Sequence, residues 1–307
     1  MRNKQDIGFW YSTNTWYEEE FIGMKNKLKD NLTIILKGYA IGSSMSVPGV
    51  SGGTMAILLG IYDRLISSIS NFFKDIKGNM SFLLKFGIGA AAGIGSLSFL
   101  IKWLLEKFPL PVSVFFLGAI VGGIPALYNR ARESVIRLSS VLYFLLGLLI
   151  VTGIGFIPAG ILNVTPGSGI VHYIMILVTG IVIALALVLP GISTSHMLLV
   201  LGMYDHMLTA ITEFDIVYIG ILGIATLIGV FLITKPIEWT LKTFPHQTYC
   251  MIIGFVLGST AEIFRDKILP AIPAGADAFW WVCSVLMSVA AFILGFMAIK
   301  SLSRFED

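Results

Sequence analysis

The chain has 307 residues, of which 56% are hydrophobic and 13% are charged, and its formal net charge is +3. No Asp, Glu, Lys or Arg occurs between Arg137 and Asp205, and an uncharged stretch of this length excludes a soluble globular protein. We therefore predict an all-α polytopic membrane protein. The small positive charge is interpreted as a topology signal, so no nucleic-acid partner is expected.

Residues 1–31 are predicted to form a polar arm on the cytoplasmic side. The arm has no apolar core and carries three consecutive glutamates, so we do not expect a cleaved signal peptide. Four aromatic residues suit an interfacial position: Trp10, Tyr11, Trp16 and Tyr17.

The first half, 32–157, is predicted to begin with a helical hairpin whose apolar arms are 32–47 and 54–68. At 1.5 Å per residue each arm reaches roughly 22 Å, which is short of the ~30 Å hydrocarbon core. This length favours a re-entrant hairpin, which enters and leaves on one side. Three predicted transmembrane helices follow, over 81–107, 112–128 and 138–157.

A polar loop, 158–169, is predicted as an extracytoplasmic linker, and the second half, 170–307, repeats the order of the first. It ends in a short cytoplasmic C-terminus. Its hairpin arms are 171–189 and 196–211, and its predicted transmembrane helices are 216–241, 248–264 and 279–299.

The repeat is clearest at the two hairpins. The first reads PGVSGGTMAILLGIYD from Pro48, the second reads PGISTSHMLLVLGMYD from Pro190, and eight of the sixteen positions are identical. Composition alone gives about one match. Three spans per half turn the second half upside down, which predicts two inverted repeats. In this topology seventeen Lys and Arg lie on the cytoplasmic side and four outside, so both termini are predicted to be cytoplasmic.

Each hairpin tip opens with a Pro-Gly break followed by hydroxyls and glycines. Helix N-termini that begin there suit an anion such as a phosphate, and glycines let it approach the backbone. Alternatively, the breaks are packing kinks whose hydroxyls satisfy the backbone. The candidate headgroup residues are Ser46, Pro48, Gly49, Ser51, Gly52, Gly53 and Thr54 in the first tip, and Pro190, Gly191, Ser193, Thr194, Ser195 and His196 in the second.

His196 replaces Thr54 of the first copy and is the titratable side chain nearest a tip. Either it carries a proton or stabilises phosphate charge, or it is a hydrogen-bonded packing residue. Charges inside spans often have a role, although those near span ends can snorkel to the interface. The further candidates for ion coupling are Lys102, Lys235, Glu238 and Glu262. No metal and no cofactor are expected.

The stretch PGVSGGTMAILLGIYDRLI, followed half a chain later by PGISTSHMLLVLGMYD, resembles the bacterial polyprenyl-phosphate transporter family, and the resemblance covers about 32–299. It implies a translocase of the bacterial cytoplasmic membrane that returns undecaprenyl phosphate from the outer to the inner leaflet for cell-envelope synthesis. The family motif falls on Pro48, Gly49, Ser51, Gly52, Gly53, Thr54, Pro190, Gly191, Ser193 and Ser195. Thr194 and His196 depart from it.

Two other functions stay open, and so does a homo-oligomeric state. An undecaprenyl pyrophosphate phosphatase-like enzyme is weakly suggested by Ser195-His196, but the tips lack Arg and the spans lack a Glu-x-x-x-Glu pair. We therefore expect no enzyme. A small-anion transporter could use the same cradle. A lipid-facing apolar opening favours a lipid substrate, whereas a sealed aqueous path favours a small ion.

Overall fold

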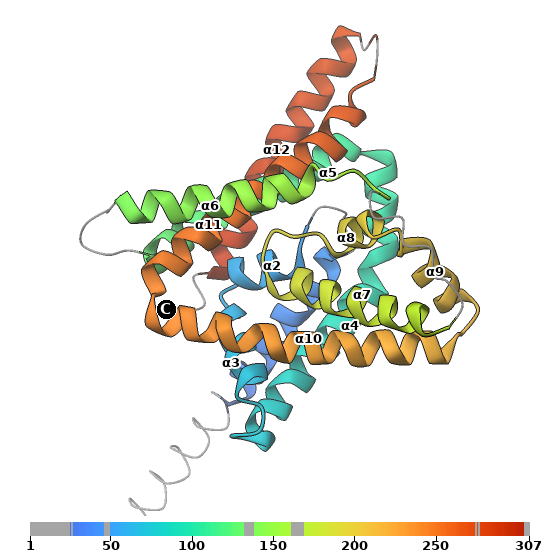
Figure 1. Cartoon of the computed structure of the whole chain (residues 1–307). Helices are drawn as coiled ribbons and strands as arrows, with labels where there is room; N and C mark the ends of the chain where they lie inside the picture. Colours follow the sequence, from blue (N-terminus) through green and yellow to red (C-terminus); the bar gives the residue numbers. More distant parts are fainter. Residues whose placement is uncertain are drawn as a thin grey trace, which may run out of the picture.

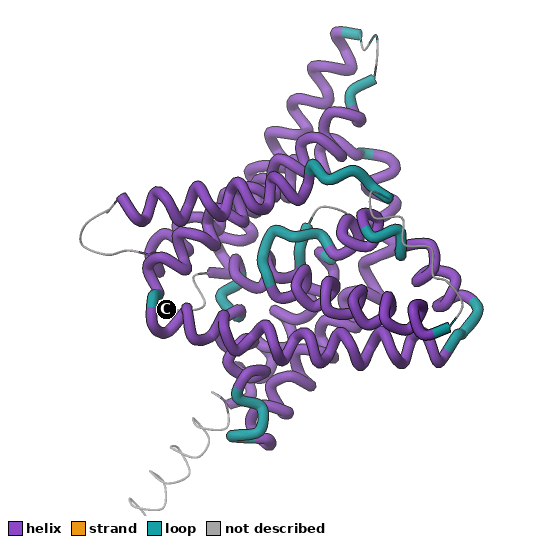
Figure 2. The backbone as a smooth tube through the Cα atoms, viewed as in Figure 1, coloured by secondary structure: helices purple, strands orange, loops and turns teal. Residues whose placement is uncertain are grey.

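The computed structural model is entirely helical in its regular secondary structure over the part of the chain that it describes (Figure 2). Within the described residues, seven helices are long and apolar enough to cross a membrane. They include all six predicted transmembrane helices, and the seventh is α7 (Ile170–Val188), which we had interpreted as a hairpin arm. The described residues are 25, 27–45, 50–131, 138–160, 169–273, 275 and 277–303.

The helices of the two halves follow in the same order. The first half contains a helix over 27–44, then α2 (Gly52–Leu58), α3 (Tyr62–Ser70), α4 (Ile76–Lys107), α5 (Pro109–Ala131) and α6 (Leu138–Gly155). The second half contains α7, α8 (Thr194–Val200), α9 (Tyr204–Thr212), α10 (Ile216–Thr243), α11 (Pro245–Ile263) and α12 (Ala278–Ser303). A π-helical turn, Phe264–Ile268, and a 3-10 turn, Leu269–Ala271, prolong α11. The opposite orientation of the halves stays a prediction.

The second arm of each hairpin was predicted as one helix, and this was wrong. Gly60 ends α2 with a φ of +66°, and the N–H of Ile61 donates to the carbonyl of Ala56, which closes the helix. Gly202 ends α8 in the same way with a φ of +71°. The break places the two motif aspartates in the first turns of α3 and α9, not at the far ends of the arms.

Helices from the two halves interlock. α12, the last helix of the second half, packs along α5 of the first half (Figure 1). In the same way α6, the last helix of the first half, packs along α11 of the second half. Glycines allow these backbones to approach closely. A Cβ placed on Gly118 of α5 would lie 2.2 Å from the carbonyl oxygen of Phe292, and one on Gly254 of α11 would lie 2.2 Å from that of Phe144. The other two pairs, α7 with α10 and the helix over 27–44 with α4, stay within their own halves.

The interior and the surface of the molecule are both apolar. The largest buried cluster surrounds the first hairpin and includes Met55, Leu58, Leu59 and Ile66. Large apolar side chains also cover the outer faces of the helices; Phe99 on α4 is 82% exposed. An apolar outer surface over several long helices is what a lipid bilayer solvates, and it agrees with a multi-pass membrane protein.

Candidate functional site

The two hairpin tips touch each other in the middle of the molecule. The backbone N–H of Gly191 donates a hydrogen bond to Oγ1 of Thr54 over 2.9 Å, and this contact is buried. A Cβ on Gly53 would lie 3.3 Å from the carbonyl oxygen of Leu187 and from Cα of Pro190. The fold therefore joins two motifs that lie half a chain apart in the sequence.

The first tip is deeply enclosed. Ser51 is 7% exposed and Thr54 is 1% exposed. Ser51 stands at the N-cap of α2, and its side chain makes no capping hydrogen bond there. Gly52 and Gly53 begin the helix, so the chain directly after Ser51 presents backbone N–H groups without side-chain cover. The other first-tip candidates, Ser46, Pro48 and Gly49, lie outside the described residues.

The second tip is capped by its own serine and is more open. Pro190 and Gly191 are buried, and Gly191 adopts a φ of +81° against α11, where a Cβ would lie 2.4 Å from the carbonyl oxygen of Phe255. Oγ of Ser193 accepts a hydrogen bond from the N–H of His196 over 3.3 Å. Thr194 is half-buried and Ser195 is exposed.

His196 leans away from the tip toward the end of α6. Its Nε2 lies 3.1 Å from the carbonyl oxygen of Ile154, and Arg265 donates to the next carbonyl, that of Gly155, over 2.6 Å. Both carbonyls lie in the last turn of α6, where His196 shares the carbonyl of Ile154 with the backbone N–H of Ile157. Glu262 and Asp266 both lie within electrostatic range of His196. The contact with Ile154 is the kind that the packing interpretation of His196 requires, and the role of His196 in transport stays a prediction.

The remaining charged candidates do not gather at the tips. Lys102 on α4 and Lys235 on α10 are exposed. Glu238 on α10 accepts hydrogen bonds from the base of the first hairpin, at Ser67, Ser70 and Asn71. Among the predicted coupling residues, His196 lies within electrostatic range of Glu262, and Lys235 and Glu238 lie one turn apart on α10. Among the described residues, no group of three or more His, Cys, Asp or Glu is arranged to hold a metal ion.

The sequence analysis missed a polar network around Asp63. Its Oδ2 lies 3.2 Å from Nη1 of Arg130 at the end of α5 and accepts a hydrogen bond from the hydroxyl of Tyr249 on α11. The neighbouring Tyr62 donates to the carbonyl oxygen of Val188 over 2.9 Å, just before the second tip. The repeated Tyr-Asp pair signalled that these positions matter, but no local pattern identified Arg130 or Tyr249 as partners.

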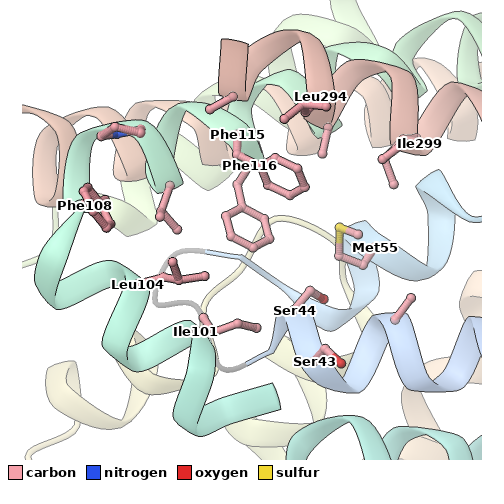
Figure 3. Close-up of a pocket in the computed structure, with 16 residues that line it drawn as sticks. Ser43, Ser44, Met55, Ile101, Leu104, Phe108, Phe115, Phe116, Leu294 and Ile299 are labelled. Carbon is pink, nitrogen blue, oxygen red and sulfur yellow. The ribbon is translucent and has the colours of Figure 1, made fainter. Parts of the chain in front are cut away.

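An apolar cavity of about 490 Å³ lies beside the first tip. Ser43, Ser44 and Met55 line it, and Figure 3 shows Phe116 reaching into the space between Met55 and Leu104. Both serine hydroxyls donate to carbonyls of their own helix, so they present little free polarity. The rest of the wall comes from Ala40 and from α4, α5 and α12, and it is apolar. A cavity of this size and lining suits a hydrocarbon chain.

Comparison with known proteins gives consistent matches. Residues 41–273 match the family described as undecaprenyl phosphate translocase-like. A protein of Vibrio cholerae named polyprenyl-phosphate transporter is 31% identical over 260 residues, which cover 80% of this chain and 81% of that protein. A protein of Staphylococcus aureus with the same name is 35% identical over 283 residues, which cover 88% and 95%. No solved structure matches.

Proposed function

We propose a function from one premise: the chain belongs to the undecaprenyl phosphate translocase-like family. Its relatives are named as transporters of polyprenyl phosphate, and it is a multi-pass bacterial membrane protein. We propose that it is a translocase that returns undecaprenyl phosphate from the outer to the inner leaflet of the cytoplasmic membrane, where the carrier re-enters cell-envelope synthesis.

The apolar cavity beside the first tip is the observation that carries this proposal. A transporter of a small anion needs a polar path along its whole length, whereas a lipid carrier needs polar groups only for its headgroup. Here a wall that is almost wholly apolar begins at Met55, which follows Thr54 on α2. In the proposed complex the phosphate lies at the tips and the isoprenoid chain lies along α4, α5 and α12.

The headgroup in this proposal is held where the two tips meet. The phosphate is the barrier to crossing, because a charge at the bilayer centre costs from several to more than ~10 kcal/mol. Hydroxyls of Ser51, Ser193, Thr194 and Ser195 and the N–H groups at the start of α2 would replace water around it. The contact between Thr54 and Gly191 supports a single shared cradle.

The same proposal includes two inverted repeats with re-entrant hairpins and both termini in the cytoplasm. Equivalent helices of the two halves make equivalent pairs, since α5 with α12 matches α11 with α6. Alternating access by such repeats exposes a fixed central site to each side in turn. The orientation itself is tested by labelling single cysteines placed in the predicted inner and outer loops.

Coupling to protons completes the proposal. Inward movement of about 1.5 to 2 negative charges opposes an inside-negative potential by ~2.3 kcal/mol per charge per 100 mV. Protons that travel with the phosphate would cancel this cost, and His196 with its neighbour Glu262 is the pair that we propose to carry them. Transport that ignores separate collapse of the pH gradient and of the potential would refute the coupling.

The test is leaflet-resolved undecaprenyl phosphate in proteoliposomes. We expect the protein to speed the appearance of the phosphate on the opposite face, and the double variant Ser51→Ala with Ser193→Ala to lose most of this acceleration. The matched control is Thr33→Ala with Ser301→Ala, whose hydroxyls are exposed and bond only to carbonyls of their own helices. Equal rates with and without correctly inserted protein would refute the proposed function.

A further inference from the structure

The base of the first hairpin is fastened to α10 by one carboxylate. Oε1 of Glu238 accepts hydrogen bonds from Asn71 over 2.6 Å and from Ser67 over 3.1 Å, and Ser70 donates to Oε2. The side chain of Glu238 is only 13% exposed, and Lys242, one turn further along α10, pairs with it. We call this set, Ser67, Ser70, Asn71, Glu238 and Lys242, the first latch.

Aromatic packing extends the first latch along α10. The ring of Phe231 lies 6.2 Å from that of Phe73 in a stacked arrangement and 6.3 Å from that of Phe72 in an edge arrangement. Figure 1 shows α3 directly below α10, where these contacts lie. The base of the first hairpin is therefore held by both polar and apolar contacts.

The internal repeat assigns a counterpart to every member of the first latch. The pairs Trp103–Phe108 and Trp239–Phe244 both pack edge to face at equivalent ends of α4 and α10, which fixes the register there. The equal lengths of α3 and α9, both beginning at the motif tyrosine, fix it at the hairpins. The counterparts of Ser67, Ser70, Asn71, Glu238 and Lys242 are Thr209, Thr212, Glu213, Lys102 and Glu106.

The counterparts keep the polar chemistry with the donor and acceptor roles exchanged. The two serine hydroxyls correspond to threonine hydroxyls. The acceptor Glu238 corresponds to the donor Lys102, and the donor Asn71 corresponds to the acceptor Glu213. Even the helical neighbour is reversed, since Lys242 becomes Glu106. Glu238 and Lys242 have counterparts of opposite charge, Lys102 and Glu106, and an acidic residue stands in place of the neutral Asn71. Lys102 and Glu213 can therefore attract each other as a new donor and acceptor.

In this structure the counterpart residues on α9 do not pack against those on α4. The structure leaves four of these residues exposed: Lys102, Thr209, Thr212 and Glu213. The ion pairs within the described part of the chain include neither Lys102 nor Glu213. Phe214, the counterpart of Phe72, is 81% exposed. α9 does not pack along α4 as α3 packs along α10. The α4 surface has room, because a Cβ on Gly95, the counterpart of Phe231, would meet no atom within 4 Å.

We infer that Lys102, Thr209, Thr212 and Glu213 form a second latch, which fastens the base of the second hairpin to α4 when the first latch opens. The inference rests on the proposed transport cycle, in which the two halves exchange conformations. Each latch stabilises one end state, and the observed structure is the state with the first latch closed. The second hairpin is then free to admit a headgroup from its own side.

Charge exchange tests the second latch. We expect Lys102→Glu and Glu213→Lys each to slow undecaprenyl phosphate transport by at least about fivefold, because like charges then oppose closure, and we expect the double variant to restore it. Lys107→Glu, an exposed reversal on the last turn of the same helix, is the control and keeps its rate. A double variant as slow as the single ones would overturn the inference.

Disulfide cross-linking tests the contact without relying on transport. In protein with Cys250→Ser and Cys283→Ser, the pair Phe72→Cys with Phe231→Cys reports the first latch and leaves its polar residues in place. The counterpart pair Phe214→Cys with Gly95→Cys reports the second latch. We expect both pairs to cross-link in proteoliposomes, with undecaprenyl phosphate changing their ratio at least about twofold. The distant pair Thr209→Cys with Lys235→Cys is the background.

The transport and cross-linking experiments together distinguish failure of the second latch from failure of the proposed function. A second-latch pair that cross-links no more than the background overturns the inference, whatever the protein transports. Cross-linking that occurs without any movement of undecaprenyl phosphate retains the second latch and refutes the proposed substrate.

Discussion

The two hairpins share half of a sixteen-residue motif, yet they differ sharply in how the protein holds them. In α2 every residue after Gly52 is buried, whereas in α8 only Leu198 and Val200 are. Other helices hold the first hairpin at Tyr62, at Asp63 and, through Glu238 of α10, at its base. The second hairpin is anchored mainly at its tip. The residues that the two motifs share thus specify similar helices and turns, and the partners supplied by other helices decide which hairpin is held.

The largest effect is expected at the anchor of the second hairpin. Gly191→Ala would force a side chain into a left-handed φ and against the carbonyl oxygen of Phe255, so it should cost about 2–4 kcal/mol. Thermal unfolding in detergent measures this loss. Gly153→Ala in α6 has no atom within 4 Å of its Cβ and should not destabilise the protein. Equal melting temperatures for the two variants would show that the second tip is not anchored.

Glu238→Ala should loosen the first hairpin. It removes a carboxylate that accepts hydrogen bonds from Ser67, Ser70 and Asn71, at a cost of about 1–3 kcal/mol. Hydrogen exchange of the α3 amides should become faster, while that of α9 stays unchanged. Lys102→Ala is the counterpart control, and it should alter neither helix because Lys102 is exposed in this state.

The repeated motif aspartates should respond unequally. Asp63→Asn weakens the ion pair with Arg130 and the hydrogen bond from Tyr249, and we expect a loss of about 1–2 kcal/mol. Asp205 is exposed, and Asp205→Asn should stay within about 0.5 kcal/mol of the unchanged protein. Denaturant titration of both variants measures the difference. A loss at Asp205 as large as that at Asp63 would remove the asymmetry.

The smallest effect is expected from making the second tip resemble the first. His196→Thr gives up the hydrogen bond to the carbonyl of Ile154, which should cost about 0.5–1 kcal/mol in a melting experiment. Under the proposed coupling it should also weaken the response of transport to an imposed pH gradient. An unchanged response would leave His196 as a residue that only terminates α6.

The contrast between the hairpins also shows what the sequence can reveal. The predicted spans follow from apolar runs, and the paired motif identified both tips, because these signals are local or repeated. The break at Gly60 was visible as a repeated Leu-Gly but was overlooked, since an apolar run continues on both sides of it. Arg130 and Glu238 lie far along the chain from their partners, and only the packing of helices brings them together.

The interlocked helix pairs bear on how the chain is made in the cell. Gly118 on α5 packs against the backbone of Phe292 on α12, a helix that is synthesised long after α5. At a synthesis rate of ~5–20 residues per second, the glycine face of α5 waits in the bilayer for roughly ten seconds or more. A nascent chain that stops before α12 therefore leaves this face of α5 without its packing partner.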